Sequence, residues 1–489
     1  MNISEEKKKT LISLAIAAAY GIITLILVMH HEIWSDEANV YLILKNLSLS
    51  QAIRHISEEG HPLLFYALCL PFVRLGFSMA AVQGLCHASC CAAVFLLFRF
   101  SPFPFFLNIA AVLGAGLLYF FPVMCRSYSI IPLIMFSMAV LYPKTKEKKV
   151  SAVYPAMYAA LIVAAANIHL IMYAFAVCTA LLFLKERIYA AIENTDSAKT
   201  VWNMPHKEKA IILLTGIGLV PPLIAAAMGL SHYDPFAVSI DKTQNTIPTL
   251  HKIIANLYDP LSANLTLREV PTDFLFLIMA FVIAALFFII LWKIGRTSLQ
   301  LAAAAVVSIA FQLFIYFVSN PYIMPNRILL IPAMLLFFVW AAFYENKDTP
   351  KRVMATAMAL LFAISIPGGL HAAYRDYNEN FSSAKEMAEY IQNNIPDEPD
   401  TYIFTTFPSN ALGITYYLHG RPIYDDHKKP VIYNSPNREF NMQAELSLND
   451  KAYIILCRQQ EDLLNRFTLL YATKPSILTY ETFYIVRIL

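Results

Sequence analysis

Long apolar runs constrain the fold of this chain more than any other feature of its sequence. A membrane-spanning helix needs about 20 predominantly apolar residues, and eleven runs reach or approach that length. Hydrophobic residues make up 58% of the chain and charged residues only 15%, whereas soluble domains carry about 25% charged residues. The sequence therefore predicts a polytopic α-helical membrane protein. The runs lie at residues 10–30, 79–99, 103–124, 127–142, 150–168, 170–184, 210–229, 272–292, 299–318, 327–344 and 353–371.

Composition and spacing exclude several other classes. The first apolar run is too long for a signal peptide and lacks a small-residue cleavage site, so we interpret it as a retained span. The seven cysteines show neither a disulfide framework nor a zinc-binding spacing. No basic patch interleaved with aromatic residues points to a nucleic acid as a partner.

The short segment 62–77 decides the direction of every later helix. It contains Pro62, Pro71 and Arg74 and is short for a bilayer core about 30 Å thick. If the N-terminus is cytoplasmic and this segment does not cross, the cytoplasmic loops hold 17 of the 37 Lys and Arg residues, as the positive-inside rule requires. We therefore expect a cytoplasmic N-terminus, a re-entrant or interfacial segment at 62–77, and about 11–13 spans.

The regions between and after the spans have their own patterns. Residues 37–58 have apolar residues at helical spacing with polar residues between them, which predicts two short helices on the membrane surface. The long loop 230–271 is expected on the outer side without obvious structure. The composition changes near residue 372, so we predict a membrane domain over 1–371 and an extracytoplasmic α/β domain over 372–489. Its predicted elements are a helix at Ser382–Asn394 and strands at Thr401–Phe407, Ala452–Cys457 and Thr479–Ile488.

A carboxylate pair, Asp36 and Glu37, directly follows the first span. A charge close to hydrocarbon is costly and tends to serve a function. Partial desolvation and a like-charged neighbour would raise the pKa of Asp36 and make it a candidate general base. The alternative is a solvated pair that ends the span.

Three basic side chains are expected on the same outer side: His61, Arg126 and Arg327. An arginine between two apolar spans is costly unless it meets an anion, and its planar fork suits phosphate. Together with Asp36, these residues predict a site that binds an anionic lipid head group and deprotonates a nucleophile beside it. The alternatives are a turn or helix cap for His61 and interface anchors for the arginines.

The order of these motifs resembles a known superfamily. Trp34–Tyr41 resembles a first-loop motif with an Asp-Glu pair, Gly60–Tyr66 a His-Pro-Pro-Leu element, Arg126–Tyr128 a polar break, and Asn326–Pro332 the start of a late helix. The tail 384–422 also resembles the outer domain of such proteins. On these residues the chain resembles the GT-C glycosyltransferases that use polyprenyl-phosphate sugars, such as the ArnT, RgtA-D-like and protein O-mannosyltransferase families.

The resemblance implies a fold, a reaction and roles for individual residues. It implies a GT-C-like fold in a bacterial inner membrane and inverting transfer from a polyprenyl-phosphate sugar to a glycolipid, polysaccharide or protein, as in the building of lipopolysaccharide and other cell-envelope glycans. Asp36 would be the general base, with Glu37 holding it or the sugar. The donor phosphate would contact His61, Arg126 and Arg327, and the substrate would contact Tyr41, Tyr66 and Tyr128, which are alternatively aromatic-belt residues.

The sequence also departs from the family pattern. Leu63 replaces the second proline of the His-Pro-Pro-Leu element, and Asn39 stands where the aminoarabinose branch has a basic residue. The acidic residue often found near the Arg126 motif is absent, so a divalent metal is not supported and no cofactor is predicted.

Two rival classes remain at the level of the sequence. A lipid-linked saccharide flippase, ligase or polymerase would also need outer cations, but not an acid pair fixed in the first outer loop. A secondary transporter should show inverted repeats and broken helices near the midplane, and the sequence shows no such repeat. The sugar, the acceptor and the oligomeric state are not specified by the sequence.

Overall fold

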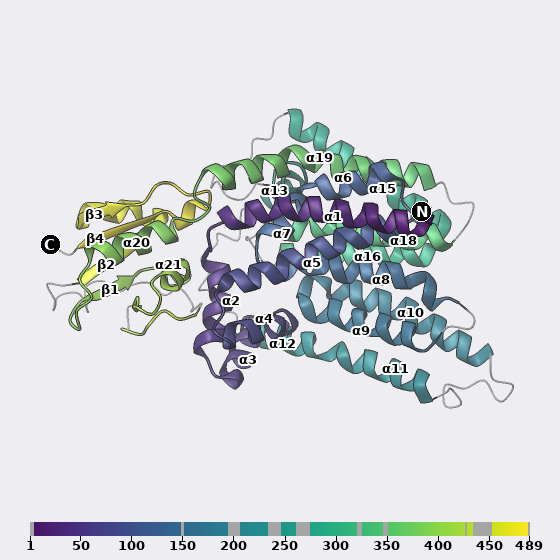
Figure 1. Cartoon of the computed structure of the whole chain (residues 1–489), viewed down its shortest axis with the longest axis horizontal. Helices are drawn as coiled ribbons and strands as arrows, with labels where there is room; N and C mark the ends of the chain where they lie inside the picture. Colours follow the sequence, from purple (N-terminus) through teal and green to yellow (C-terminus); the bar gives the residue numbers. More distant parts are fainter. Residues whose placement is uncertain are drawn as a thin grey trace.

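The computed structural model places a helical bundle next to a small α/β domain (Figure 1). The N-terminal end of α1 lies at one end of the molecule, and the C-terminus lies in the α/β domain at the other. The structure describes residues 4–147, 151–193, 206–232, 246–260, 274–319, 325–345, 351–425, 428–433 and 452–487.

Each apolar run predicted from the sequence coincides with one helix or with consecutive helices. Among the described residues, seven helices are long and apolar enough to cross a membrane, or eight if one bent pair counts as a span. The chain is therefore an integral membrane protein. The bundle helices are α1 (Glu5–His30), α5 (Met79–Phe100), α6 (Phe105–Leu113), η1 (Gly116–Phe120), α7 (Phe121–Val123), α8 (Ile131–Thr145), α9 (Val153–Ile168), α10 (Tyr173–Glu193), α11 (His206–Gly218), α12 (Val220–His232), α15 (Phe274–Thr297), α16 (Leu299–Ser319), α18 (Leu330–Glu345) and α19 (Lys351–Asn378).

The bent pair breaks between α6 and η1, with an angle of 57°. At the break, Ser365 of α19 accepts a hydrogen bond from the Ala115 amide at 3.1 Å, which satisfies a backbone group that the bend leaves free. A Cβ on Gly369 would lie 2.7 Å from the Cα of Ala115, so only glycine allows α19 to approach this closely. After the bend, η1 and α7 lead the chain to Arg126.

Ion pairs gather at the end of the bundle that is remote from the α/β domain. Lys146, near the end of α8, pairs with Glu186 of α10 at 2.9 Å and with Glu345 at the end of α18. Arg99 of α5 pairs with Glu6 at the start of α1, and Arg187 of α10 pairs with Glu208 of α11. The helix ends that border the Lys- and Arg-rich loops thus lie together, as the predicted direction of the spans requires.

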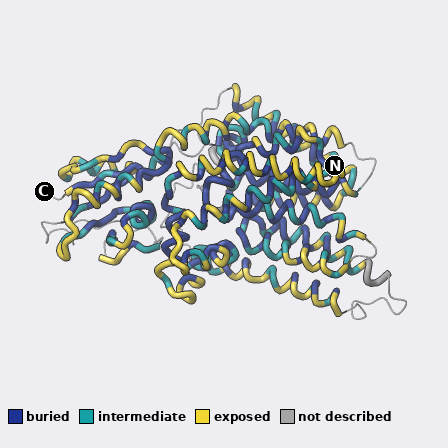
Figure 2. The backbone as a smooth tube through the Cα atoms, viewed as in Figure 1, coloured by how far each residue is buried: buried dark blue, intermediate teal, exposed yellow. Residues whose placement is uncertain are grey.

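Three short helices lie at the opposite end of the bundle: α2 (Ser35–Asn46), α3 (Leu49–Glu58) and α4 (Leu64–Arg74). The two helices expected over 37–58 are both present. Helix α3 begins with a capping box of Ser48 and Gln51 and exposes its polar side. Helix α2, in contrast, is buried over nearly its whole length (Figure 2), because the α/β domain covers the side that the bundle leaves open.

Helix α4 starts and ends at this same end of the bundle. Its 11 residues span about 16 Å, which is too short for a bilayer core of about 30 Å. Its last residue, Arg74, donates a hydrogen bond to the carbonyl of Leu47 at the end of α2. The geometry fits the re-entrant or interfacial segment expected at 62–77.

A glycine pair sets the turn between α3 and α4. Gly60 has a φ of 75°, a backbone conformation that favours glycine. A Cβ on Gly229 of α12 would lie 2.6 Å from the Cα of Gly60, so the two backbones are in contact. This close approach fixes the position of the next residue, His61.

The C-terminal domain contains a four-stranded mixed sheet in the order β1-β2-β4-β3. Strands β1 and β2 are parallel, and the other two pairs are antiparallel. The helix and the three strands predicted here are present, although the last strand starts later, after a short 3₁₀ turn at Thr479–Glu481. Strand β3 was missed because its side chains are mostly exposed and show no alternation. The elements are α20 (Ala384–Asn394), β1 (Tyr402–Thr405), α21 (Leu412–Tyr417), β2 (Ala452–Cys457), β3 (Thr468–Ala472) and β4 (Phe483–Arg487).

The long loop 230–271, which is expected on the outer side, contains a helix that was not predicted from the sequence. Helix α13 (Thr246–Tyr258) has a hydrophobic face on which Ile253 and Leu257 are buried against the bundle. The prolines and aspartates around it favoured an interpretation as a loop. Residues 233–245 and 261–273 lie outside the described part of the chain.

The α/β domain docks onto the start of α2. The hydroxyl of Tyr417 accepts a hydrogen bond from the Ile33 amide at 2.8 Å, and that of Tyr416 accepts one from the Met79 amide at 3.3 Å. The Glu481 carboxylate accepts a hydrogen bond from the Ser35 amide at 3.1 Å and a second one from the Ser35 hydroxyl. Helix α19 runs without interruption past residue 372 to Asn378 and joins the two parts.

The buried carboxyl of Glu481 should give the protein a characteristic pH dependence. Burial raises the pKa of Glu481 from 4.5 to about 7, although Ser35 and Ser382 donate hydrogen bonds to it. The folded protein then binds this proton more tightly than the unfolded chain, so ionisation reduces stability as the pH rises from 4.5 to 7. We expect Glu481→Gln, which cannot ionise, to gain thermal stability relative to the wild type between about pH 5 and pH 8.

Thermal unfolding in detergent at both pH values measures this gain. The exposed Asp462 supplies the control, since Asp462→Asn should show the same offset from the wild type at both pH values. A Glu481→Gln offset that does not change with pH would contradict a proton held at Glu481.

Candidate functional site

Asp36 and Arg126 form the centre of a polar cluster at the domain end of the bundle. Asp36 lies in the first turn of α2, and its side chain is 43% exposed. Arg126 follows the break after α7, and its side chain is 11% exposed. The guanidinium donates a hydrogen bond to the backbone carbonyl of Asp36, and its second nitrogen lies 3.7 Å from the Asp36 carboxylate. The predicted base and a predicted phosphate ligand are therefore neighbours.

Glu37 points in a different direction from Asp36 on α2, into the protein interior. Successive residues of an α-helix are about 100° apart, so adjacent carboxylates meet different surroundings. The side chain of Glu37 is completely buried and accepts a hydrogen bond from the Cys125 amide at 2.6 Å. Asp36 and Glu37, predicted as one catalytic pair, thus face different spaces.

A buried ionic network lies behind Glu37. The Nε2 atom of His31 lies 3.5 Å from the Glu37 carboxylate, and its Nδ1 atom lies 2.8 Å from that of Asp376. The hydroxyl of Tyr119 donates a hydrogen bond to the same Asp376 oxygen at 2.8 Å. Burial opposes the charge on His31, but the two carboxylates raise its pKa to about 10. His31 is therefore an imidazolium that bridges two acids.

Arg327, the other arginine predicted to bind phosphate, lies in α17 (Pro325–Ile328) and is held by Tyr128. Its Nε donates a hydrogen bond to the Tyr128 hydroxyl at 2.8 Å, and this hydroxyl is also 2.9 Å from Nε2 of His169. The ring of His169 lies 6.2 Å from that of His61. Residues 320–324, just before α17, lie outside the described part of the chain.

His61 lies close enough to both arginines for their charges to act on it. Burial lowers the pKa of His61, and the nearby charges of Arg126 and Arg327 lower it further against the opposing charge of Glu59. The lowered pKa favours the neutral imidazole of His61, which can donate one hydrogen bond and accept another. A buried arginine, a partly buried arginine and a histidine, beside a half-exposed carboxylate, suit an anionic ligand next to a group that loses a proton.

The three predicted tyrosines have different surroundings. Tyr128 lies in the cluster, as described above, and the ring of Tyr66 lies 6.4 Å from that of His61. Tyr41, in contrast, packs edge-on against Tyr416 of the α/β domain at 5.2 Å, and its hydroxyl donates to the carbonyl of Phe77. The structure therefore brings Tyr66 and Tyr128 toward the site and gives Tyr41 contacts in the domain interface.

Sequence reasoning missed four residues of this region: His169, Glu59, His31 and Asp376. His169 separates two apolar runs by a single residue, and a polar residue at such a break was the available signal. Glu59 is paired with His55 at 3.5 Å and with Asn39 at 3.3 Å. His31 and Asp376 carry no spacing signal, since they are 345 residues apart in the chain.

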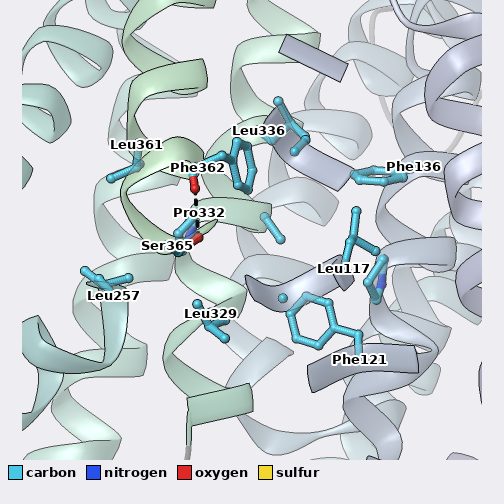
Figure 3. A pocket seen from close by; sticks show the side chains of 14 residues that line it. Leu117, Phe121, Phe136, Leu257, Leu329, Pro332, Leu336, Leu361, Phe362 and Ser365 are labelled. Atoms are coloured by element: carbon cyan, nitrogen blue, oxygen red, sulfur yellow. Dashed lines mark hydrogen bonds between the residues drawn. The ribbon is translucent and has the colours of Figure 1, made fainter. Parts of the chain in front are cut away.

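Within the described part of the chain, no group of three or more His, Cys, Asp or Glu side chains is arranged to hold a metal ion. The described residues also enclose an apolar pocket between η1, α8, α13, α18 and α19 (Figure 3). Its side chains include Leu117, Phe121 and Leu336, and its polar hydroxyl, on Ser365, donates a hydrogen bond to the carbonyl of Phe362. None of the residues that line this pocket is titratable, so the pocket offers no candidate group for proton transfer.

Comparisons with known proteins detect a similarity of fold but no match at the level of the amino-acid sequence. No protein-family model and no curated protein matches the chain. A crystal structure of ArnT from Cupriavidus metallidurans in the apo state matches it with a TM-score of 0.53 and 11% identity, over 97% of both chains. The chain has the ArnT fold. A structure of ArnT from the same organism bound to undecaprenyl phosphate matches with a TM-score of 0.49 and 13% identity, again over 97% of both chains. The first match confirms the GT-C-like fold expected from the motifs.

Tyr128 should couple energetically to Arg327. Tyr128→Phe removes one hydrogen-bond partner from the partly buried guanidinium of Arg327 and one from the buried imidazole of His169, which should lower the free energy of unfolding by about 1–3 kcal/mol. Denaturant unfolding in detergent measures this loss, with the exposed Tyr374→Phe as the control. In an Arg327→Met background, the cost of Tyr128→Phe should be clearly smaller; fully additive costs would show that the hydroxyl does not hold Arg327.

Proposed function

We propose that this chain is a membrane glycosyltransferase that moves a sugar from a polyprenyl-phosphate donor to an acceptor, with inversion at the anomeric carbon. The observation that carries the proposal is the half-exposed carboxylate of Asp36 beside the buried guanidinium of Arg126. The four motifs that resemble the GT-C glycosyltransferases and the ArnT fold support it.

The proposed reaction uses Asp36 as the general base. The proton of an acceptor hydroxyl or amine goes to the Asp36 carboxylate, and the freed electron pair forms the bond to the anomeric carbon. The bond between that carbon and the phosphate oxygen breaks, and its electron pair stays on the polyprenyl phosphate. The acceptor is a component of the cell envelope: a glycolipid, a polysaccharide or a protein.

The cations act on the departing phosphate, whose negative charge grows as the bond breaks. Arg126 and Arg327 are preorganised by the Asp36 carbonyl and the Tyr128 hydroxyl, so they need little rearrangement during the reaction. A neutral His61 can donate one hydrogen bond to a phosphate oxygen, and Tyr66 lies at its side. Glu37 is given a positioning role here, since it is buried away from Asp36.

The main test compares transfer of a labelled sugar by the wild type and Asp36→Asn. Synthetic polyprenyl-phosphate sugars and isolated membrane acceptors serve as substrates, with the purified protein in nanodiscs. Loss of a general base should lower turnover about 10²–10⁴-fold, while Glu37→Gln should lose much less because its oxygen still accepts the Cys125 amide. The exposed Glu389→Gln on α20 is the control for the loss of one carboxylate.

Each other outcome has a definite meaning. Full turnover by Asp36→Asn, together with a loss of turnover in Glu37→Gln, would assign the role of general base to Glu37. Absence of transfer by the wild type from every donor would favour a lipid-linked saccharide flippase or a transporter.

We also propose that the site and the α/β domain face the outside of a bacterial inner membrane. The Lys- and Arg-rich loops border the opposite end of the bundle, which the positive-inside rule assigns to the cytoplasm. Asp462→Cys should react with a membrane-impermeant maleimide in intact spheroplasts, whereas Lys8→Cys should react only after lysis. Both residues are exposed, so the reverse pattern would invert the proposed orientation.

A further inference from the structure

Three chain segments converge on one buried ionic network. His31 follows α1, Glu37 lies in α2 and Asp376 lies near the end of α19, and their side chains are at most 1% exposed. The imidazole lies between the two carboxylates at 2.8 Å and 3.5 Å. Tyr119 of η1 adds a hydrogen bond to Asp376. Segments far apart in the sequence are thus tied together by charge.

Such a network is costly in a buried place. Moving ions out of water has a penalty that their mutual attraction repays only with good geometry, and hydrophobic side chains of similar volume often stabilise a fold equally well. Packing alone therefore does not require these three ionisable groups. Their presence is explained if the attached segments must be held in one fixed arrangement.

Two of the segments that the network holds carry the central pair of the site, Asp36 and Arg126. Glu37 directly follows Asp36 on α2, and the Cys125 amide that Glu37 binds directly precedes Arg126. The Glu37 carboxylate therefore links the backbone next to Asp36 with the backbone next to Arg126. Its own place depends on the imidazolium of His31, which is held in turn by Asp376.

We infer that His31 and Asp376 are positioning residues, which hold Glu37 so that it sets Arg126 against Asp36. This inference rests on the proposed function, because the arrangement that they set is the one proposed to transfer the sugar. Neither residue contacts the half-exposed face of Asp36, so they act through Glu37 and do not touch the substrate.

The test is a double-mutant cycle in turnover. His31→Gln should lower kcat about tenfold, which corresponds to about one hydrogen bond to a charged group. If His31 acts through Glu37, the double variant His31→Gln/Glu37→Gln should lose no more than the stronger single variant. Turnover is measured per folded enzyme, well below the melting temperature, so a loss of stability alone leaves kcat unchanged.

The neighbouring histidine supplies a matched control. His30 is exposed and packs on Tyr377 at 4.2 Å, so His30→Gln should keep the turnover of the wild type. If His31→Gln does not fold, Asp376→Asn and Asp376→Leu replace it. Asparagine still accepts the hydrogen bonds of His31 and Tyr119 and should retain most of the activity, while leucine should not.

The outcomes separate this inference from the proposed function. Wild-type kcat in His31→Gln, multiplicative losses in the double variant, or equal activity of Asp376→Asn and Asp376→Leu would each overturn the positioning role and leave the transferase intact. Absence of transfer by the wild type would remove both.

Discussion

The first turn of α2 is the place on which the rest of the structure depends. A helix N-terminus presents unsatisfied amides and a partial positive charge. Here Glu481 of the α/β domain accepts the Ser35 amide, while Glu37 leaves the same turn toward the bundle. The turn is thereby fixed from two sides, and Asp36 keeps its half-exposed carboxylate between them. The docking of the α/β domain and the geometry of the site therefore depend on the same turn of α2.

Adjacent carboxylates have different tasks because of helix geometry. The rotation between Asp36 and Glu37 places one carboxylate next to Arg126 and the other beside His31. A sequence shows two neighbouring acids, but their division into a half-exposed group and a fully buried one follows only from the packing of α2. The paired burial of charges explains why so polar a cluster is stable at the end of an apolar bundle.

The sequence predicted those parts of the molecule that local patterns determine. Hydrophobic length gave the bundle helices, and the motif positions of Asp36, His61, Arg126 and Arg327 correctly anticipated that they gather at one end. Patterns failed where long-range contacts decide. Helix α13 and strand β3 depend on packing against distant elements, and the partnership of His31 with Asp376 joins residues that are 345 positions apart in the chain.

The pairing of Ser35 with Glu481 spans 446 residues. A ribosome that adds about 5–20 residues per second therefore leaves the start of α2 uncapped for tens of seconds after its synthesis. During that time the nascent protein has its first membrane helix but not the domain that covers α2. A chain that stops before Glu481 therefore lacks the carboxylate that binds the first turn of α2, one residue before Asp36.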